Sequence, residues 1–133
     1  MESLKSVPGL SFYSLQKGRD QRESAGLIDL TPELSSIDDT ASFICALDLV
    51  ITADVMVSHL AGALDVPTWV LVDINPHYSW GRQGRDTPWY RSVRVYRQRK
   101  MFDWRSVFQE VSKDLAELTA RTRARVSSSV EPG

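Results

Sequence analysis

The chain has 133 residues, of which 42% are hydrophobic and 25% charged, as in ordinary globular domains rather than disordered segments. Its 16 basic and 17 acidic residues give a formal net charge of −1, so no general basic field favours nucleic acid as a partner. No apolar run reaches the roughly 18 residues of a membrane helix, and the first residues, MESLKSVPGLSF, do not form a signal peptide. The single cysteine, Cys45, excludes an internal disulfide and offers no metal cluster. We therefore expect a soluble, cytoplasmic domain with no metal and no cofactor.

Five short segments predict strands. The runs at 49–52 (LVIT) and 68–72 (TWVLV) are almost entirely apolar, as strands buried on both faces of a parallel sheet are. Residues 93–97 (VRVYR) alternate in polarity, which favours a strand nearer the sheet edge. Residues 11–15 (SFYSL) and 27–30 (LIDL) are the other two predicted strands.

Three helices are expected between and after these strands. Ser36 and Asp39 have capping-box spacing, and an apolar stripe that includes Ile44 and Cys45 follows them, so we expect Cys45 to be a small core residue. The second helix runs from just after Asp54 to about residue 64. The third begins near Asp103 and places an apolar stripe on one face, formed by Val107, Val111, Leu115 and Leu118. This alternation predicts an α/β fold, a Rossmann-like parallel sheet in one layer with helices on both faces.

Two segments fall outside this pattern. Residues 119–133 lose the apolar periodicity and become rich in serine, so we expect a domain at 1–118 followed by a flexible tail at 119–133. The connection at 73–91 is long for a compact domain, and such loops are usually functional or mobile. Its aromatic residues Trp80, Trp89 and Tyr90 either stack on a ligand base or a facing domain, or simply pack against the sheet.

A candidate ligand site lies where the strand at 49–52 ends and the next helix begins. Ligands of open α/β sheets bind beyond the carboxyl ends of the strands, and the free amides of a helix N-terminus suit phosphate. Asp54 at this junction either caps the helix or accepts a hydrogen bond from a ligand hydroxyl. His59 is either a satisfied histidine at the boundary of the core or a residue that reaches a bound diphosphate.

The same residues carry a family resemblance. The run D-x-x-x-x-H-L-A-G-A-L-x-x-P-x-W, which starts at Asp54, resembles the nucleotide-sugar-binding half of glycosyltransferase family 9. That family includes the bacterial heptosyltransferases and relatives fused to tetratricopeptide repeats. Residues 86–90 (DTPWY) resemble the D-[ST]-P-W-Y loop of the repeat-fused branch. Further matches at 12–18, 28–30, 39–51, 96–98 and 103–104 extend the similarity over residues 7–118.

The resemblance implies the C-terminal, donor-binding half of a GT-B glycosyltransferase, a class in which no metal is expected. By carry-over, Asp54, the backbone of Val55 and Met56, and His59 line the diphosphate and ribose region. Lys17 and Gly18, in the turn at 16–18, lie at another strand end on the same sheet edge, where Lys17 can approach the nucleotide. No catalytic residue is assigned.

The chain also departs from the family. Val55 stands where a hydroxyl residue often follows the Asp, and Gly84 stands where an Arg often precedes the D-[ST]-P-W-Y motif. Against the family's pattern, we expect this chain to lack the usual first strand of the sheet and the acceptor-binding domain. We therefore expect a nucleotide-sugar-binding part of a glycosyltransferase that is inactive alone because it lacks the acceptor domain. The expected partners are the nucleotide-sugar donor and an acceptor domain or tetratricopeptide-repeat region of a longer protein. The alternative is a non-catalytic remnant that acts as an interaction or oligomerisation module through the exposed sheet edge. The sequence leaves the sugar, the nucleotide and the acceptor open.

Overall fold

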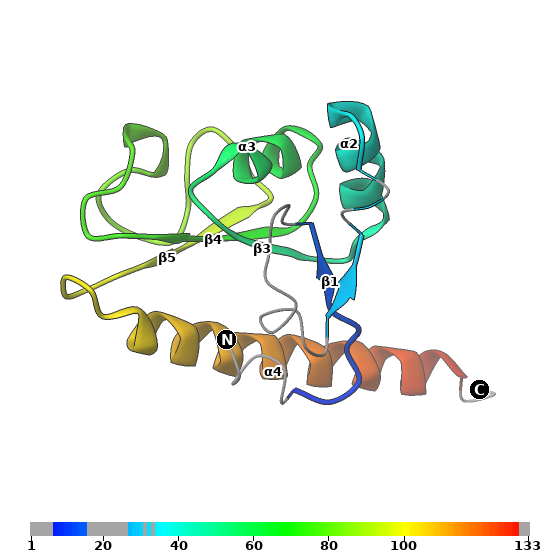
Figure 1. The fold of residues 1–133 in the computed structure, drawn as a ribbon. Coiled ribbons are helices and arrows are strands. Elements are labelled where there is room, and N and C mark those ends of the chain that lie inside the picture. The colour runs from blue at the N-terminus through cyan, green and yellow to red at the C-terminus, as the bar shows by residue number, and fades with distance from the viewer. Residues whose placement is uncertain (1–6, 16–26, 31, 33, 131–133) are drawn as a thin grey trace.

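The structure is a computed structural model that describes residues 7–15, 27–30, 32 and 34–130 (Figure 1). The sequence predicted all five strands and all three α-helices that follow. In chain order the elements are β1 (Tyr13–Ser14), β2 (Ile28–Asp29), α2 (Ile37–Ala46), β3 (Val50–Ala53), α3 (Met56–Ala63), β4 (Thr68–Val72), the 3-10 helix η2 (Tyr78–Trp80), β5 (Val93–Arg97) and α4 (Trp104–Val130).

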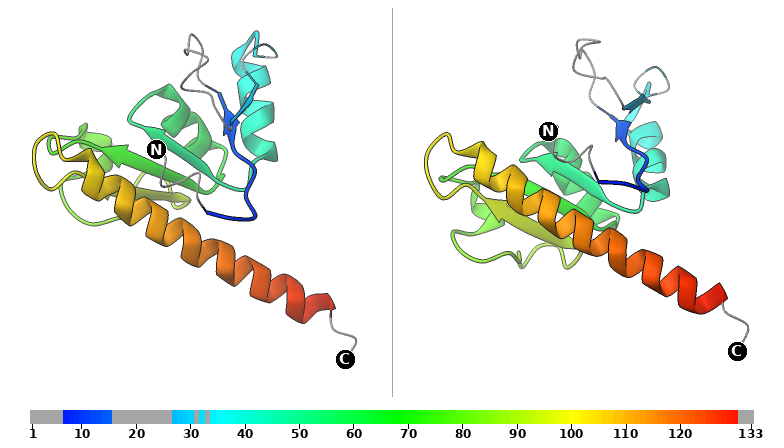
Figure 2. Two further views of the ribbon diagram at one scale, coloured as in Figure 1. Left: turned by 60° about the horizontal axis from the view of Figure 1, so that its bottom comes forward. Right: turned by 90° about the horizontal axis from the view of Figure 1, so that it is seen from below.

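The central element is a three-stranded parallel sheet in the order β3-β4-β5. All five residues of β4 are buried, because β4 lies between two strands and has helices above and below it. Helix α3 lies over one face of this sheet and α4 crosses the other (Figures 1 and 2). The predicted α/β class, with parallel strands and helices on both faces, is confirmed.

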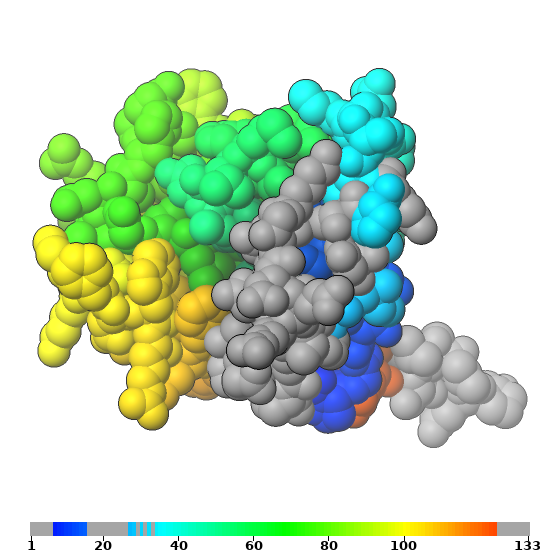
Figure 3. Space-filling model, viewed as in Figure 1, coloured from blue at the N-terminus to red at the C-terminus, as the bar shows by residue number. Residues whose placement is uncertain are grey.

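Side-chain alternation along β4 divides the core in two. Trp69 and Leu71 point to the face covered by α4, where they pack with Tyr96 and with the apolar stripe of Val107, Val111 and Leu115. Val70 and Val72 point to the opposite face and pack with Trp80 from the loop between β4 and β5. That loop projects from the end of the molecule opposite α2 and the first two strands (Figures 1 and 3). The sequence predicted the stripe on α4, except that Leu118 is exposed.

Helix α2 begins as the sequence predicted. The Asp39 amide donates to Ser36 Oγ at 3.1 Å and the Ser36 amide donates to Asp39 Oδ2 at 3.1 Å, which completes the capping box. Hydrogen bonds from Ser35 and Ser36 lower the pKa of the Asp39 carboxyl. The expectation for Cys45 was wrong: the face of α2 that meets the body of the molecule buries Ile44 and leaves Cys45 exposed.

The single layer expected for the strands is also wrong. β1 and β2 pair in parallel with each other and form a separate two-stranded sheet, because β3 pairs with β4 and with no strand of the described N-terminal segment. At the other end of the chain, α4 continues as a helix to Val130, beyond residue 118, where we expected the domain to end. None of the helices in the described ranges is long and apolar enough to span a membrane.

Candidate functional site

The candidate site is the start of α3, directly beyond the carboxyl end of β3. Val55 is the N-cap residue, with an extended backbone (φ −138°, ψ 176°) and no side-chain hydrogen bond to the helix. The first amides of a helix have no partner within it, and α3 has no acidic residue in its first turn to neutralise its positive end. The Val55 amide itself donates to the Ala53 carbonyl oxygen at 2.9 Å. Of the two backbone positions expected to meet phosphate, Met56 therefore offers the available amide.

Asp54 does not cap this helix. Its carboxylate turns toward His59 instead, with Asp54 Oδ1 3.9 Å from His59 Nε2. The side chains are 32% and 38% exposed, respectively, so solvent or a ligand can reach both. A separation of 3.9 Å is too long for a direct hydrogen bond. A small polar group that binds beside the pair can therefore bridge the two atoms by a hydrogen bond to each.

Two aromatic side chains from the loop between β4 and β5 hold the His59 ring. Trp80 stacks on it, with ring centroids 4.9 Å apart and an interplanar angle of 29°. Tyr90 meets it edge-on at 5.9 Å and 66°, and its hydroxyl lies 3.1 Å from His59 Nδ1. Trp80 and Tyr90 thus pack against the sheet and α3, one of the two alternatives for this loop, whereas Trp89 is exposed.

Arg97, at the end of β5, fastens this loop to the sheet. Its guanidinium donates to the carbonyl oxygens of Gly81 at 2.8 Å and Gly84 at 2.7 Å, and also to that of Trp80. Burial lowers the pKa of Arg97. This role was not predicted, although a basic residue at the carboxyl end of a strand is a visible signal in the sequence.

Two further arginines of the loop, Arg85 and Arg91, have partners on or directly beyond neighbouring helices. Arg85 pairs with Glu110 of α4 and lies 3.5 Å from Asp114. Arg91 forms two hydrogen bonds, of 2.7 and 3.2 Å, with the carboxylate of Asp65 just beyond α3. The hydrogen bonds from Arg91 lower the pKa of Asp65. These pairs anchor both sides of the loop.

Two predicted site residues, Lys17 and Gly18, lie outside the described residues. The structure therefore brings together Asp54, Val55, Met56 and His59 and adds Trp80 and Tyr90 to them. Within the described ranges, no group of three or more histidine, cysteine, aspartate or glutamate side chains could hold a metal ion.

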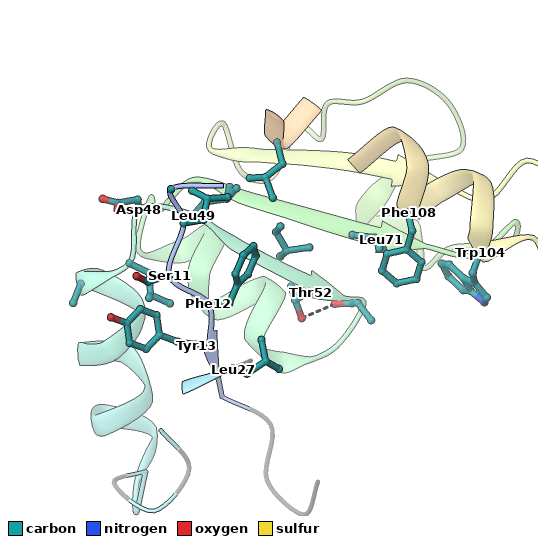
Figure 4. Close-up of a pocket in the computed structure, with 17 residues that line it drawn as sticks. Ser11, Phe12, Tyr13, Leu27, Asp48, Leu49, Thr52, Leu71, Trp104 and Phe108 are labelled. Carbon is teal, nitrogen blue, oxygen red and sulfur yellow. Dashed lines mark hydrogen bonds between the residues drawn. The ribbon is translucent and has the colours of Figure 1, made fainter. Parts of the chain in front are cut away.

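A cavity of about 790 Å³ lies between β1 and β3, next to this site but separate from it (Figure 4). The sequence analysis did not predict it. Its walls are mostly apolar and come from the first sheet, from β3 and from the face of α4 that covers the core. The side chains labelled in Figure 4 include Phe12, Leu49, Thr52, Leu71, Trp104 and Phe108.

The fold and this junction define a parallel α/β domain of Rossmann-like topology with an uncapped helix directly beyond β3, the first strand of the three-stranded sheet. The chain is 31% identical over 130 residues to Protein FlbA of Caulobacter vibrioides. The alignment covers 90% of this chain and 21% of FlbA, so the chain spans a small part of the relative's length. No protein-family model matches the chain, and no solved structure matches it significantly.

Proposed function

We propose that this chain binds the nucleotide diphosphate of a sugar donor, as the donor-binding part of a glycosyltransferase that transfers the sugar to an acceptor hydroxyl. The observation that carries the proposal is the uncapped start of α3 with the Asp54–His59 pair beside it. The resemblance of the run from Asp54 to Trp69 to glycosyltransferase family 9 supports the same function. A separate acceptor-binding part would complete the enzyme, and without it the chain is expected to bind donor and not to turn it over.

The two halves of the site suit different parts of such a donor. The amides of Met56 and Val57 and the positive end of the helix suit the diphosphate, whereas the Ser58 amide already donates to the Val55 carbonyl oxygen at 2.9 Å. The Asp54–His59 pair suits a hydroxyl, since a hydroxyl can accept from His59 Nε2–H and donate to the Asp54 carboxylate across the 3.9 Å gap. A phosphate oxygen only accepts and would be repelled by Asp54. We therefore assign the gap to a hydroxyl of the ribose.

Titration calorimetry with UDP, ADP and GDP, without added metal, tests the proposal. One nucleotide should bind, and Asp54→Ala and His59→Ala should each weaken it at least tenfold, about 1.4 kcal/mol. Asp38→Ala is the matched control, because it removes an exposed carboxylate from the start of another helix, α2. The proposal fails if the folded chain binds none of the three, or if both site variants bind as tightly as the original chain.

A second candidate function, a non-catalytic interaction module, is favoured by a different observation. Among the residues that the structure describes, β3 pairs with β4 on one edge and with no strand on the other, where the apolar cavity lies. Exposed strand edges pair readily with another chain, here a second copy. Light scattering after size exclusion should then give a dimer that dissociates on dilution. A monomer at every concentration contradicts this candidate and leaves nucleotide binding untouched.

A further inference from the structure

We propose that Tyr90 is a positioning residue for His59. Its hydroxyl donates to His59 Nδ1 and thereby holds the imidazole in the tautomer whose Nε2–H faces Asp54. The Tyr90 hydroxyl oxygen lies 3.1 Å from His59 Nδ1, although the two residues are 31 positions apart in the chain. The consequence for ligand binding rests on the proposed function, whereas the tautomer itself can be measured in the free protein.

The chemistry of the neighbours selects the tautomer. The negative charge of the Asp54 carboxylate, 3.9 Å away, favours a hydrogen on the nitrogen that faces it, Nε2, over an electron pair there. Nδ1 of the same neutral ring then has a free electron pair, which accepts from the Tyr90 hydroxyl. The hydrogen bond at one ring nitrogen thus determines what the other nitrogen presents. Tyr90 makes His59 a donor at the position where the proposed ligand hydroxyl binds.

Packing keeps both rings in place. Trp80 covers one face of the His59 ring, and Tyr90 contacts its edge. The Tyr90 ring in turn lies on Gly62 of α3. The adjacent Arg91 donates from Nε and Nη2 to the two carboxylate oxygens of Asp65, which ties the chain next to Tyr90 to the end of α3. A rotation of the imidazole would have to displace one of the two aromatic rings.

The test uses the imidazole nitrogen signals of the free protein. The chain has two histidines, so a ¹⁵N long-range spectrum contains two ring systems, and His77→Gln identifies the other. At roughly pH 8, above the ordinary imidazole range near 6.5, His59 should show the Nε2–H pattern. Tyr90→Phe keeps the ring and removes the hydroxyl, and it should shift His59 toward a mixture of tautomers. Tyr78→Phe, at an exposed position of the same loop, should leave the pattern unchanged.

The affinity for the nucleotide that binds best is measured on the same proteins. Tyr90→Phe should weaken it roughly fivefold, the effect of one neutral hydrogen bond, with little change in Tm. Unchanged His59 signals in Tyr90→Phe overturn the proposal, whether or not the affinity falls, because a loss of affinity would then come from Tyr90 itself. A shifted tautomer in a chain that binds no nucleotide supports the role of Tyr90 and refutes the proposed function instead.

Discussion

Tyr90 lies so close to Gly62 that no side chain fits between them. A Cβ atom on Gly62 would be 2.6 Å from Cγ of Tyr90 and 2.9 Å from both Cδ atoms of the ring. Gly62 is a buried residue of α3, a helix in which alanine would otherwise be the more stable residue at this position. The glycine is therefore explained by the aromatic ring that lies on it and not by backbone conformation.

We expect Gly62→Ala to destabilise the chain by about 1 to 3 kcal/mol, the usual cost of overpacking. It should also displace Tyr90 and so weaken its hydrogen bond to His59. Urea denaturation measures the first effect, and the His59 nitrogen signals report the second.

The control for Gly62→Ala is the same substitution in a Tyr90→Ala background. With the ring removed, the new methyl group has space, and the better helix propensity of alanine should stabilise the chain by up to about 1 kcal/mol. In the double-mutant cycle, the effect of Gly62→Ala on the free energy of unfolding should therefore change sign between the two backgrounds. Equal costs in both backgrounds would mean that Gly62 is required for another reason.

Val55 offers a prediction that does not depend on any ligand. It occupies the N-cap of α3 in the extended conformation that a capping residue adopts, but its side chain cannot accept a hydrogen bond. Val55→Thr keeps the shape and adds the missing oxygen, so it should stabilise the chain by about 0.5 to 2 kcal/mol. Thermal denaturation provides the measurement. Val57→Thr, the same change inside the helix, should bring no gain, and an equal gain at both positions would contradict the capping explanation.

The elements that the sequence predicted best are those determined by neighbours in the chain. β4 and β5 have the predicted bounds, because an uninterrupted apolar run and a strict alternation are local patterns. The capping box of Ser36 and Asp39 likewise spans a few residues. The start of α3 was predicted from a strand followed at once by a helical pattern, and that junction contains Asp54 and His59.

The contacts that complete the site could not be predicted in this way. Tyr90 reaches His59 across 31 residues, and only the path of the loop between β4 and β5 decides which aromatic side chain arrives there. Trp80 is buried and Trp89 exposed in the same loop, although their residue type is identical. The separation of β1 and β2 from the main sheet is also non-local, since it depends on which strand edges pair.

Arg97 should keep the loop between β4 and β5 in its folded conformation. Replacing it by methionine keeps much of its length but leaves the carbonyl oxygens of Gly81 and Gly84 without their donor. We expect trypsin to cut Arg97→Met faster than the original chain after Arg82 and Arg85, two exposed loop residues. Mass spectrometry of the early fragments locates the cuts. In Arg99→Met, a substitution at a nearby exposed position, trypsin should cut after Arg82 and Arg85 at the original rate. A similar acceleration in both variants would contradict the role of Arg97.

Tyr96 should make the stability of the chain fall in alkaline solution. Its ring is buried between the sheet and α4, and its hydroxyl donates to Asp114 Oδ2 at 2.8 Å. Burial, and then this hydrogen bond to a carboxylate, raise the pKa of Tyr96 far above its ordinary value.

The direction of the effect follows from proton binding. As the pH rises through about 10, the ordinary tyrosine pKa, an unfolded chain releases the Tyr96 proton and a folded chain keeps it. The stabilisation is therefore complete below that pH, and above it the unfolding free energy falls by up to about 1.4 kcal/mol per pH unit. Tyr96→Phe should flatten this decline, with Asp114 still paired to Arg85 and Arg94 at 3.5 and 3.4 Å. Urea denaturation at a series of alkaline pH values tests this, with Tyr78→Phe as the exposed control. An equally steep decline in Tyr96→Phe would show that other groups cause it.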